Sequence, residues 1–317
     1  MSRGTSYRLI IGLLPWLTLG LLGLPVASGL LGALLPAFGY LPALDGDRLT
    51  LAPWRALFNM PGMIDMIRLS LVTGLASAAL SLGIVVLFWG SFLHTPLYRR
   101  VQRWLSPLLA VPHAAAAIGL AFLLAPSGWV VRALSPWATG WQYPPDYAFP
   151  GDPWGLSLIL GLMIKEVPFL LLMSLAALVQ CQAHERLTVA RSLGYGPLTA
   201  FLKVVMPGLY PLLRLPVYAV IAFSTSTVDV ALILGPNTPS TLAVSVVRWL
   251  NDPSLTMRFM ASAGALLQML LTLVALAAWY AVERLVAYLG QGWVQDGRRQ
   301  CGERWLGRAA LLSLRLV

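Results

Sequence analysis

Long apolar runs recur along the whole chain, each bounded by proline, glycine or charged residues. A helix needs roughly 20 apolar residues to cross a bilayer, and in lipid every backbone hydrogen bond must be made within the protein. We interpret six runs as membrane spans, at Leu9–Leu31, Met66–Leu93, Leu105–Leu124, Leu156–Leu178, Tyr210–Leu232 and Met260–Ala281. The sequence therefore predicts an all-α, polytopic membrane protein with six transmembrane helices.

The composition supports a location of the chain in a lipid bilayer and argues against other environments. Hydrophobic residues make up 58% of the chain and charged residues only 11%, whereas soluble domains carry about 25% charged residues. The net charge of +10 is not accompanied by a basic and aromatic nucleic-acid module, so we expect contacts with membrane lipid and none with nucleic acid. Cys181 and Cys301 show no metal-binding or redox spacing.

The basic residues define an orientation. They gather around Arg99–Arg103, around Arg186–Lys203 and after Arg284, whereas the intervening outer segments hold fewer arginines and most of the aspartates. By the positive-inside rule, both termini are predicted on the cytoplasmic side. The first run exceeds the apolar core of a signal peptide, about 7–15 residues, so we expect an uncleaved first span, with cleavage near Ala27 as the alternative.

These patterns divide the chain into two parts. Residues 1–290 are predicted to form one six-span domain, with a cytoplasmic loop at about residues 182–207. Residues 291–317 form a basic cytoplasmic tail, which is also where a second half of a longer protein would begin. In the outer segment before the sixth span, Leu242–Leu250 is predicted to be a short helix at the membrane interface.

The cytoplasmic loop begins with a helical pattern. Leu187, Ala190 and Leu193 have the spacing of one helix face, which predicts a helix over residues 184–193. Gly194 follows directly and supplies a left-handed cap, because glycine adopts positive φ without steric cost.

A second helix is predicted after this glycine. Pro197 suits the first position of a helix, and Leu198 and Phe201 lie on one stripe of residues 197–205. Pro207 is expected to end this helix before the fifth span. Two short helices joined at a glycine make a compact projection suited to insertion into a groove of another protein.

The same loop resembles the EAA loop of ABC importer permeases. That pattern reads Glu-Ala-Ala, three residues, Gly, nine residues, an aliphatic residue, one residue and Leu-Pro. Gly194, Val204, Met206 and Pro207 stand at the matching positions, with methionine in place of the leucine. The triplet itself reads Thr188-Val189-Ala190, so its acidic residue is missing, and Glu185 lies one turn earlier.

The resemblance implies a six-helix permease of the type I ABC importer kind, in a bacterial inner (plasma) membrane. Its partner would be a dimer of ATPase subunits, which bind and hydrolyse ATP, so this chain would bind no cofactor itself. Gly194 would shape the loop, and Leu187, Ala190, Leu198 and Phe201 would fill a groove of the ATPase. The implied coupling residues are Glu185, Leu187, Ala190, Gly194, Pro197, Leu198, Phe201 and Pro207.

Three further segments, Val111–Trp129, Lys165–Leu171 and Val228–Pro236, are similar to thiamine-type permeases of the thiamine, ferric-iron and polyamine importers. The resemblance implies thiamine or a related cationic solute, delivered by a periplasmic or extracellular substrate-binding protein. Members of this group often carry two six-span halves. The chain shows one half, so it either pairs with a second permease chain or corresponds to a shortened fused permease.

Ionisable residues within the predicted spans are candidates for a translocation path. A charged group costs about 2.5–3.5 kcal/mol at the centre of a membrane helix on insertion scales, so it is found facing the bundle interior or water. The adjacent Lys165 and Glu166 point about 100° apart on a helix, so one of them is expected to reach another helix, with Asp229 as one partner for Lys165. The candidates are His113, Lys165, Glu166 and Asp229; helix packing is the alternative role for each.

Catalytic signatures are missing from the sequence. It contains no G-x-x-x-x-G-K-[ST] phosphate loop, H-E-x-x-H or G-x-S-x-G motif, and His94, His113 and His184 form no metal-binding pattern. We therefore expect a transport subunit and not an enzyme. The alternative is an ion-coupled secondary transporter that uses Lys165, Glu166 and Asp229 and needs no ATPase.

Overall fold

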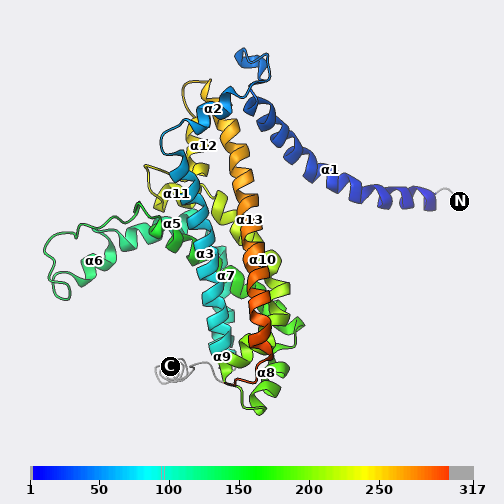
Figure 1. Ribbon diagram of the computed structural model, residues 1–317, viewed down its shortest axis with the longest axis vertical. Helices are drawn as coiled ribbons and strands as arrows, with labels where there is room; N and C mark the ends of the chain where they lie inside the picture. The colour runs from blue at the N-terminus through cyan, green and yellow to red at the C-terminus, as the bar shows by residue number, and fades with distance from the viewer. Residues whose placement is uncertain (1–2, 94, 96, 300–317) are drawn as a thin grey trace. The chain divides into compact units, whose positions relative to one another are not determined.

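The computed structural model describes residues 3–93, 95 and 97–299, and these are helical over most of their length (Figure 1). The described part contains no β-strand; Leu41 and Gly46 form an isolated bridge. Six helical segments are long and apolar enough to cross a membrane, namely Gly12–Ala37, Met63–Phe92, His113–Leu134, Leu156–Gln180, Pro197–Ser226 and Met257–Gln295. The predicted all-α architecture with six spans is confirmed.

One compact unit consists of residues 1–63 and 245–269. It contains α1 (Arg3–Ala37), the short 3-10 helix η1 (Pro42–Leu44) and α2 (Ala52–Phe58). The most apolar stretch of α1 has no buried side chain, as expected for a helix that faces lipid on all sides. Trp54 of α2 stacks on the Phe58 ring at a centroid distance of 6.2 Å, and the Phe38 ring lies tilted to it at 6.0 Å.

The other unit consists of residues 64–244 and 270–317, and the basic tail lies outside the described residues from residue 300 onward. The expected short helix over residues 242–250 is present, and the last helix runs to residue 295. The helices are α3 (Met63–Phe92), α4 (Leu97–Ala110), α5 (His113–Leu124), α6 (Trp129–Leu134), α7 (Leu156–Gln180), α8 (Ala183–Ser192), α9 (Pro197–Ala200), the π-helical η2 (Phe201–Val205), α10 (Met206–Ser226), α11 (Asp229–Leu234), α12 (Leu242–Leu250) and α13 (Met257–Gln295). Two of these helices, α12 and α13, lie partly in the first unit.

The core of this larger unit lies where α3, α7 and α10 meet the loop helix α8. Trp89 is 1% exposed, and its indole nitrogen donates to Ser174 Oγ at 2.6 Å. Leu170 and Leu209 are buried in the same cluster, together with residues of α4 and α8. A second cluster joins α5, α7 and α11. Within this unit, α8 and α9 lie at one end and α11 toward the other (Figure 1).

The third predicted span is interrupted. We expected one helix over residues 105–124, but α4 ends at Ala110 and α5 begins at His113, with Pro112 in an extended conformation between them (φ −60°, ψ 147°). Proline lacks the amide hydrogen that a continuous helix requires and disfavours helical geometry at the residue before it. The 12 residues of α5 rise only about 18 Å, less than the roughly 30 Å of a bilayer core.

The fifth predicted span also ends early. We expected it to reach Leu232, but α10 ends at Ser226, and Thr227 is extended (φ −65°, ψ 138°) before α11 starts at Asp229. Hydroxyl side chains compete for backbone carbonyls at this end: Thr225 Oγ1 donates to Ile221 O at 2.8 Å and Ser226 Oγ to Ala222 O at 2.7 Å. Asp229 consequently begins a separate short helix.

Candidate functional site: the interhelical loop and the buried polar groups

The loop between α7 and α10 has the predicted glycine cap. Gly194 has φ +84°; its amide donates to Arg191 O at 2.9 Å, and the amide of Tyr195 donates to Ala190 O at 3.2 Å. This pair of bonds is a Schellman motif, which satisfies the last carbonyls of α8 and turns the chain sharply. The predicted helix, turn and second helix start at Pro197 are confirmed.

Pro207 does not end the second helix as predicted. The backbone remains helical from α9 through η2 into α10, and Pro207 lies in the first turn of α10. In an α-helix the nitrogen of residue 207 would face the carbonyl of Lys203, but proline has no hydrogen to donate there and its ring crowds that carbonyl. The wider π turn over residues 201–205 accommodates this defect, as π bulges do within longer helices.

The expectation that Leu187, Ala190, Leu198 and Phe201 fill a partner's groove is wrong for three of them. Leu187 and Phe201 are 0% exposed and Ala190 is 3% exposed, all within the main core of their own chain. Leu198 is half-buried and packs close to Gly90 of α3. The periodicity identified the correct helix face, but this face anchors the loop to the bundle.

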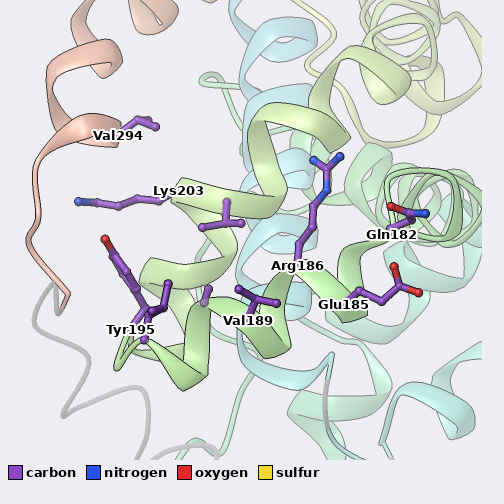
Figure 2. A pocket seen from close by; sticks show the side chains of 10 residues that line it. Gln182, Glu185, Arg186, Val189, Tyr195, Lys203 and Val294 are labelled. Carbon is purple, nitrogen blue, oxygen red and sulfur yellow. The ribbon is translucent and has the colours of Figure 1, made fainter.

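The outward face of the loop carries other side chains. Glu185, Pro197 and Pro207 are exposed, as are Val189 (60%) and Leu193 (55%). Glu185, Val189 and Leu193 border a hollow of about 460 Å³. In Figure 2, Arg186, Gln182 and Glu185 lie on one side of it and Tyr195, Lys203 and Val294 on the other. Sequence analysis missed Val189, and it placed Leu193 on the face of Leu187 and Ala190, although Leu193 is exposed in the structure. Helical spacing gives the direction of a side chain but not whether a neighbouring helix covers it.

The segment after α13 is fastened to this loop. The Lys203 ammonium donates to Asp296 O at 2.9 Å, to Arg298 O at 3.0 Å and to the Asp296 carboxylate, and it lies 4.8 Å from the Trp293 ring centroid. This ammonium holds the pKa of the Asp296 carboxyl below its ordinary value. The amide of Gly196 donates to Arg299 O at 3.0 Å. The only feature of the sequence that pointed to this contact is Asp296, a single aspartate within a basic stretch.

Lys165 reaches another helix, as expected, but its partner is backbone. Its ammonium donates to Leu108 O at 2.8 Å, Leu109 O at 3.1 Å and Val111 O at 2.6 Å. These carbonyls lie at the C-terminal end of α4, where the helix leaves acceptors unpaired. The suggested pairing with Asp229 is wrong, because the ion pairs of the described residues involve Lys203, Arg214 and Arg298.

Glu166 points away from Lys165, as the helical geometry predicts. It is 4% exposed, and its carboxyl oxygens lie within hydrogen-bond distance of serine hydroxyls of α3 and α10. His113 begins α5 two residues after Val111, and its ring lies 4.7 Å from the Phe223 ring. Asp229 is exposed at the start of α11. The structure therefore places His113 and Lys165 at one helix break, with Asp229 within range of an electrostatic interaction with His113. Glu166 points instead to α3 and α10.

Arg214 holds α10 against α13. Its Nε and Nη2 each lie 2.8 Å from Glu283 Oε2. Tyr210 and Tyr218 donate their hydroxyl hydrogens to the same carboxylate at 2.5 and 3.2 Å. Glu283 was not identified from sequence because its partners come from a different span. No cluster of metal-ligating side chains occurs among the residues that the structure describes.

Comparison with known proteins gives one informative relative. The chain is 31% identical over 271 residues to the inner membrane ABC transporter permease protein YnjC of Escherichia coli K12. The match covers 86% of this chain and 48% of the relative, so the chain spans about half the length of the protein it matches. No protein-family model matches the chain. Together with the six apolar helices, this similarity identifies a multi-pass inner-membrane protein.

Proposed function

We propose that this chain is the transmembrane permease subunit of an ABC importer and that it couples to a separate ATPase through residues 185–207. The observation that carries the proposal is the loop itself: a glycine-capped helix pair fixed to the core at one end of the larger unit. The similarity of most of the chain to an inner membrane ABC transporter permease supports the same function.

The loop is suited to transmit force. Leu187 and Phe201 are fully buried in the cluster that also contains Trp89 and Leu209. Because α9 and η2 continue into α10 without a break, displacement of the loop would move α10 as a rigid body. ATP-driven closure of a partner ATPase dimer would thereby change the packing of the spans and alternate access across the membrane.

The docking face we assign to the ATPase is the exposed side of α8. Val189 and Leu193 offer an apolar patch, and Glu185 and Arg186 offer charges of both signs next to the hollow. Exposed apolar groups bordered by polar ones are typical of protein interaction surfaces. The missing acidic residue at Thr188 indicates that Glu185 supplies the negative charge of this face.

We place the translocation path near the two helix interruptions, at Pro112 and at Thr227. Discontinuous helices within a membrane are common at transport sites because they leave backbone groups available to a solute. His113 and Lys165 lie at the first interruption and Asp229 follows the second; Glu166 lies in the bundle interior. A small solute, with thiamine or a related cation as the candidate class, would arrive from a substrate-binding protein. A second permease half or chain would complete the path.

Copurification tests the proposal. The affinity-tagged chain is extracted from its native membrane in mild detergent and its partners are identified by mass spectrometry. Wild type should recover an ATPase with a phosphate-binding loop. Val189→Glu and Leu193→Glu should lose it, because each places a charge in the apolar patch. Ser192→Glu is the matched control, since this exposed residue is on α8 but does not border the hollow.

Recovery of no ATPase from a folded wild-type sample would overturn the proposal. Uptake driven by an ion gradient after ATP depletion would then favour the secondary-transporter alternative. Equal recovery with Val189→Glu, Leu193→Glu and wild type would retain the permease function but exclude this face as the docking site.

A further inference from the structure

One face of α3 is lined with buried hydroxyl groups. Ser70, Thr73, Ser77 and Ser81 recur at intervals of three and four residues, and each is at most 1% exposed. This spacing places them on one side of the helix. The rest of the core around them is largely apolar, so this stripe marks a polar site inside the bundle.

Glu166 of α7 points into this stripe. Its Oε1 lies 3.0 Å from Ser77 Oγ and within hydrogen-bond reach of Ser224 Oγ, and its Oε2 lies 2.8 Å from Ser81 Oγ. The three serines come from α3 and α10. The carboxyl group is thus enclosed by three helices, and Glu166 as a whole is 4% exposed.

The hydrogen atoms at this site can be arranged in two ways. Ser77 Oγ also lies 3.1 Å from Gly74 O, and Ser224 Oγ lies 2.7 Å from Val220 O. A hydroxyl has one hydrogen, so each of these serines donates either to its helix carbonyl or to Glu166. If both donate to the carbonyls, Glu166 must itself carry a hydrogen and donate it to one of them. No heavy atom moves between the two arrangements.

The charged groups around Glu166 do not compensate a carboxylate. Lys165, its neighbour on α7, donates to the carbonyls of α4. On α10, Arg214 is paired with Glu283 of α13. His113 of α5 packs on Phe223, one residue before Ser224. An uncompensated carboxylate inside a membrane protein is costly, whereas a neutral carboxyl that is fully hydrogen-bonded is not.

We propose that Glu166, Ser77, Ser81 and Ser224 form a proton-binding site in the bundle and that Glu166 holds the proton in this arrangement of helices. The proton comes from water and is shared between the carboxyl group and a serine oxygen. Because α3, α7 and α10 all contribute to the site, separating them exposes the carboxyl group to water and releases the proton. This inference does not depend on the proposed transport function.

Carbon-13 NMR tests the site directly. The chain has four glutamates, Glu166, Glu185, Glu283 and Glu303, so full-length protein labelled at the glutamate carboxyl carbon and reconstituted in lipid gives four signals. Glu166→Gln identifies the signal of residue 166. At neutral pH we expect that signal at the position of a protonated carboxyl and not of a carboxylate. An infrared carboxylic-acid band that shifts in heavy water and is missing from Glu166→Gln is the second readout.

One serine variant and one threonine control test whether the Glu166 signal depends on its hydrogen-bond partners. Ser81→Ala removes the donor to Oε2 and should change the Glu166 carboxyl shift. Thr73→Val is the control, because the Thr73 hydroxyl on the same buried face donates to Leu69 O at 2.7 Å. A carboxylate signal for residue 166 in folded protein at neutral pH would overturn the proposal. If Glu166→Gln fails to fold, the signal that Ser81→Ala shifts is assigned to Glu166 instead. A carboxylate position of that signal in the wild-type protein would likewise overturn the proposal.

Discussion

Gly74 and Thr225 bring α3 and α10 into backbone contact. A Cβ atom on Gly74 would lie 2.9 Å from both the Cα and N atoms of Thr225 and 2.5 Å from its Cγ2 atom. Glycine is therefore required here for close helix approach, as small residues are at many membrane helix crossings. The crossing lies one turn from Ser77 and one residue from Ser224, so it also encloses the Glu166 carboxyl group.

Gly74→Ala should destabilise the protein. The added methyl group meets backbone atoms that cannot rotate away, and overpacking of this kind costs about 1–3 kcal/mol. Thermal unfolding of the purified chain in detergent should show a lower midpoint. Gly83→Ala on the same helix is the control, because a Cβ there meets nothing within 4 Å; equal midpoints for the two variants would refute the close approach.

Lys165→Met should loosen the break between α4 and α5. It leaves three helix-end carbonyls without the ammonium that now donates to them, and a buried acceptor left unpaired costs about 1–3 kcal/mol. Hydrogen exchange measured by mass spectrometry should be faster for residues 106–116 than in wild type. Ile164→Met, one position earlier on α7, should leave this exchange unchanged, and unchanged exchange in Lys165→Met would contradict the assigned contact.

Gly194→Val should weaken the proposed coupling of the loop to a separate ATPase without preventing membrane insertion. A β-branched residue at φ +84° is strained by roughly 1–2 kcal/mol, whereas asparagine tolerates the left-handed region. Copurification of the ATPase that we propose as the partner should fall for Gly194→Val and be retained for Gly194→Asn. Gly194→Asp is a poorer probe, because a Cβ at this position would lie 3.5 Å from Arg299 Nη1, where aspartate would gain an ion pair.

Asp296→Asn should release the segment after α13 from the loop at neutral pH. The Lys203 contact lowers the pKa of Asp296, so this contact stabilises docking above the ordinary aspartate pKa of about 3.9 and is lost as pH falls through the lower folded-state pKa. Exchange of the Gly196 amide, which donates to Arg299 O, should therefore be faster in the variant at pH 7. After correction for intrinsic rates, the difference from wild type should disappear in strong acid.

Asp146→Asn is the matched control for this experiment, since Asp146 is exposed in the segment between α6 and α7. Exchange at Gly196 that is the same in Asp296→Asn and wild type at pH 7 would show that the backbone contacts alone hold the segment.

Much of the loop was predictable from local chemistry. Gly194 and Pro197 determine the end of α8 and the start of α9 through their own backbone preferences. The turn was therefore predictable from residues that are close in the sequence. The face that we propose for docking was not predictable in the same way. Leu187 and Val189 are both apolar residues of one short helix, but Leu187 is buried and Val189 is 60% exposed. Only the position of α10 and α3 decides which of them is covered.

The sequence by itself determined the six apolar spans, the helical class and the glycine-capped loop, because bilayer thickness, backbone hydrogen bonding and φ preferences act on neighbouring residues. The tertiary structure decided the partners of the buried polar groups. Lys165 meets the end of α4 and Glu166 meets serines up to 89 residues away, and such pairings depend on which helices cross and where. A helical period gives the direction of a side chain around its own axis, but only packing supplies the atoms that it meets.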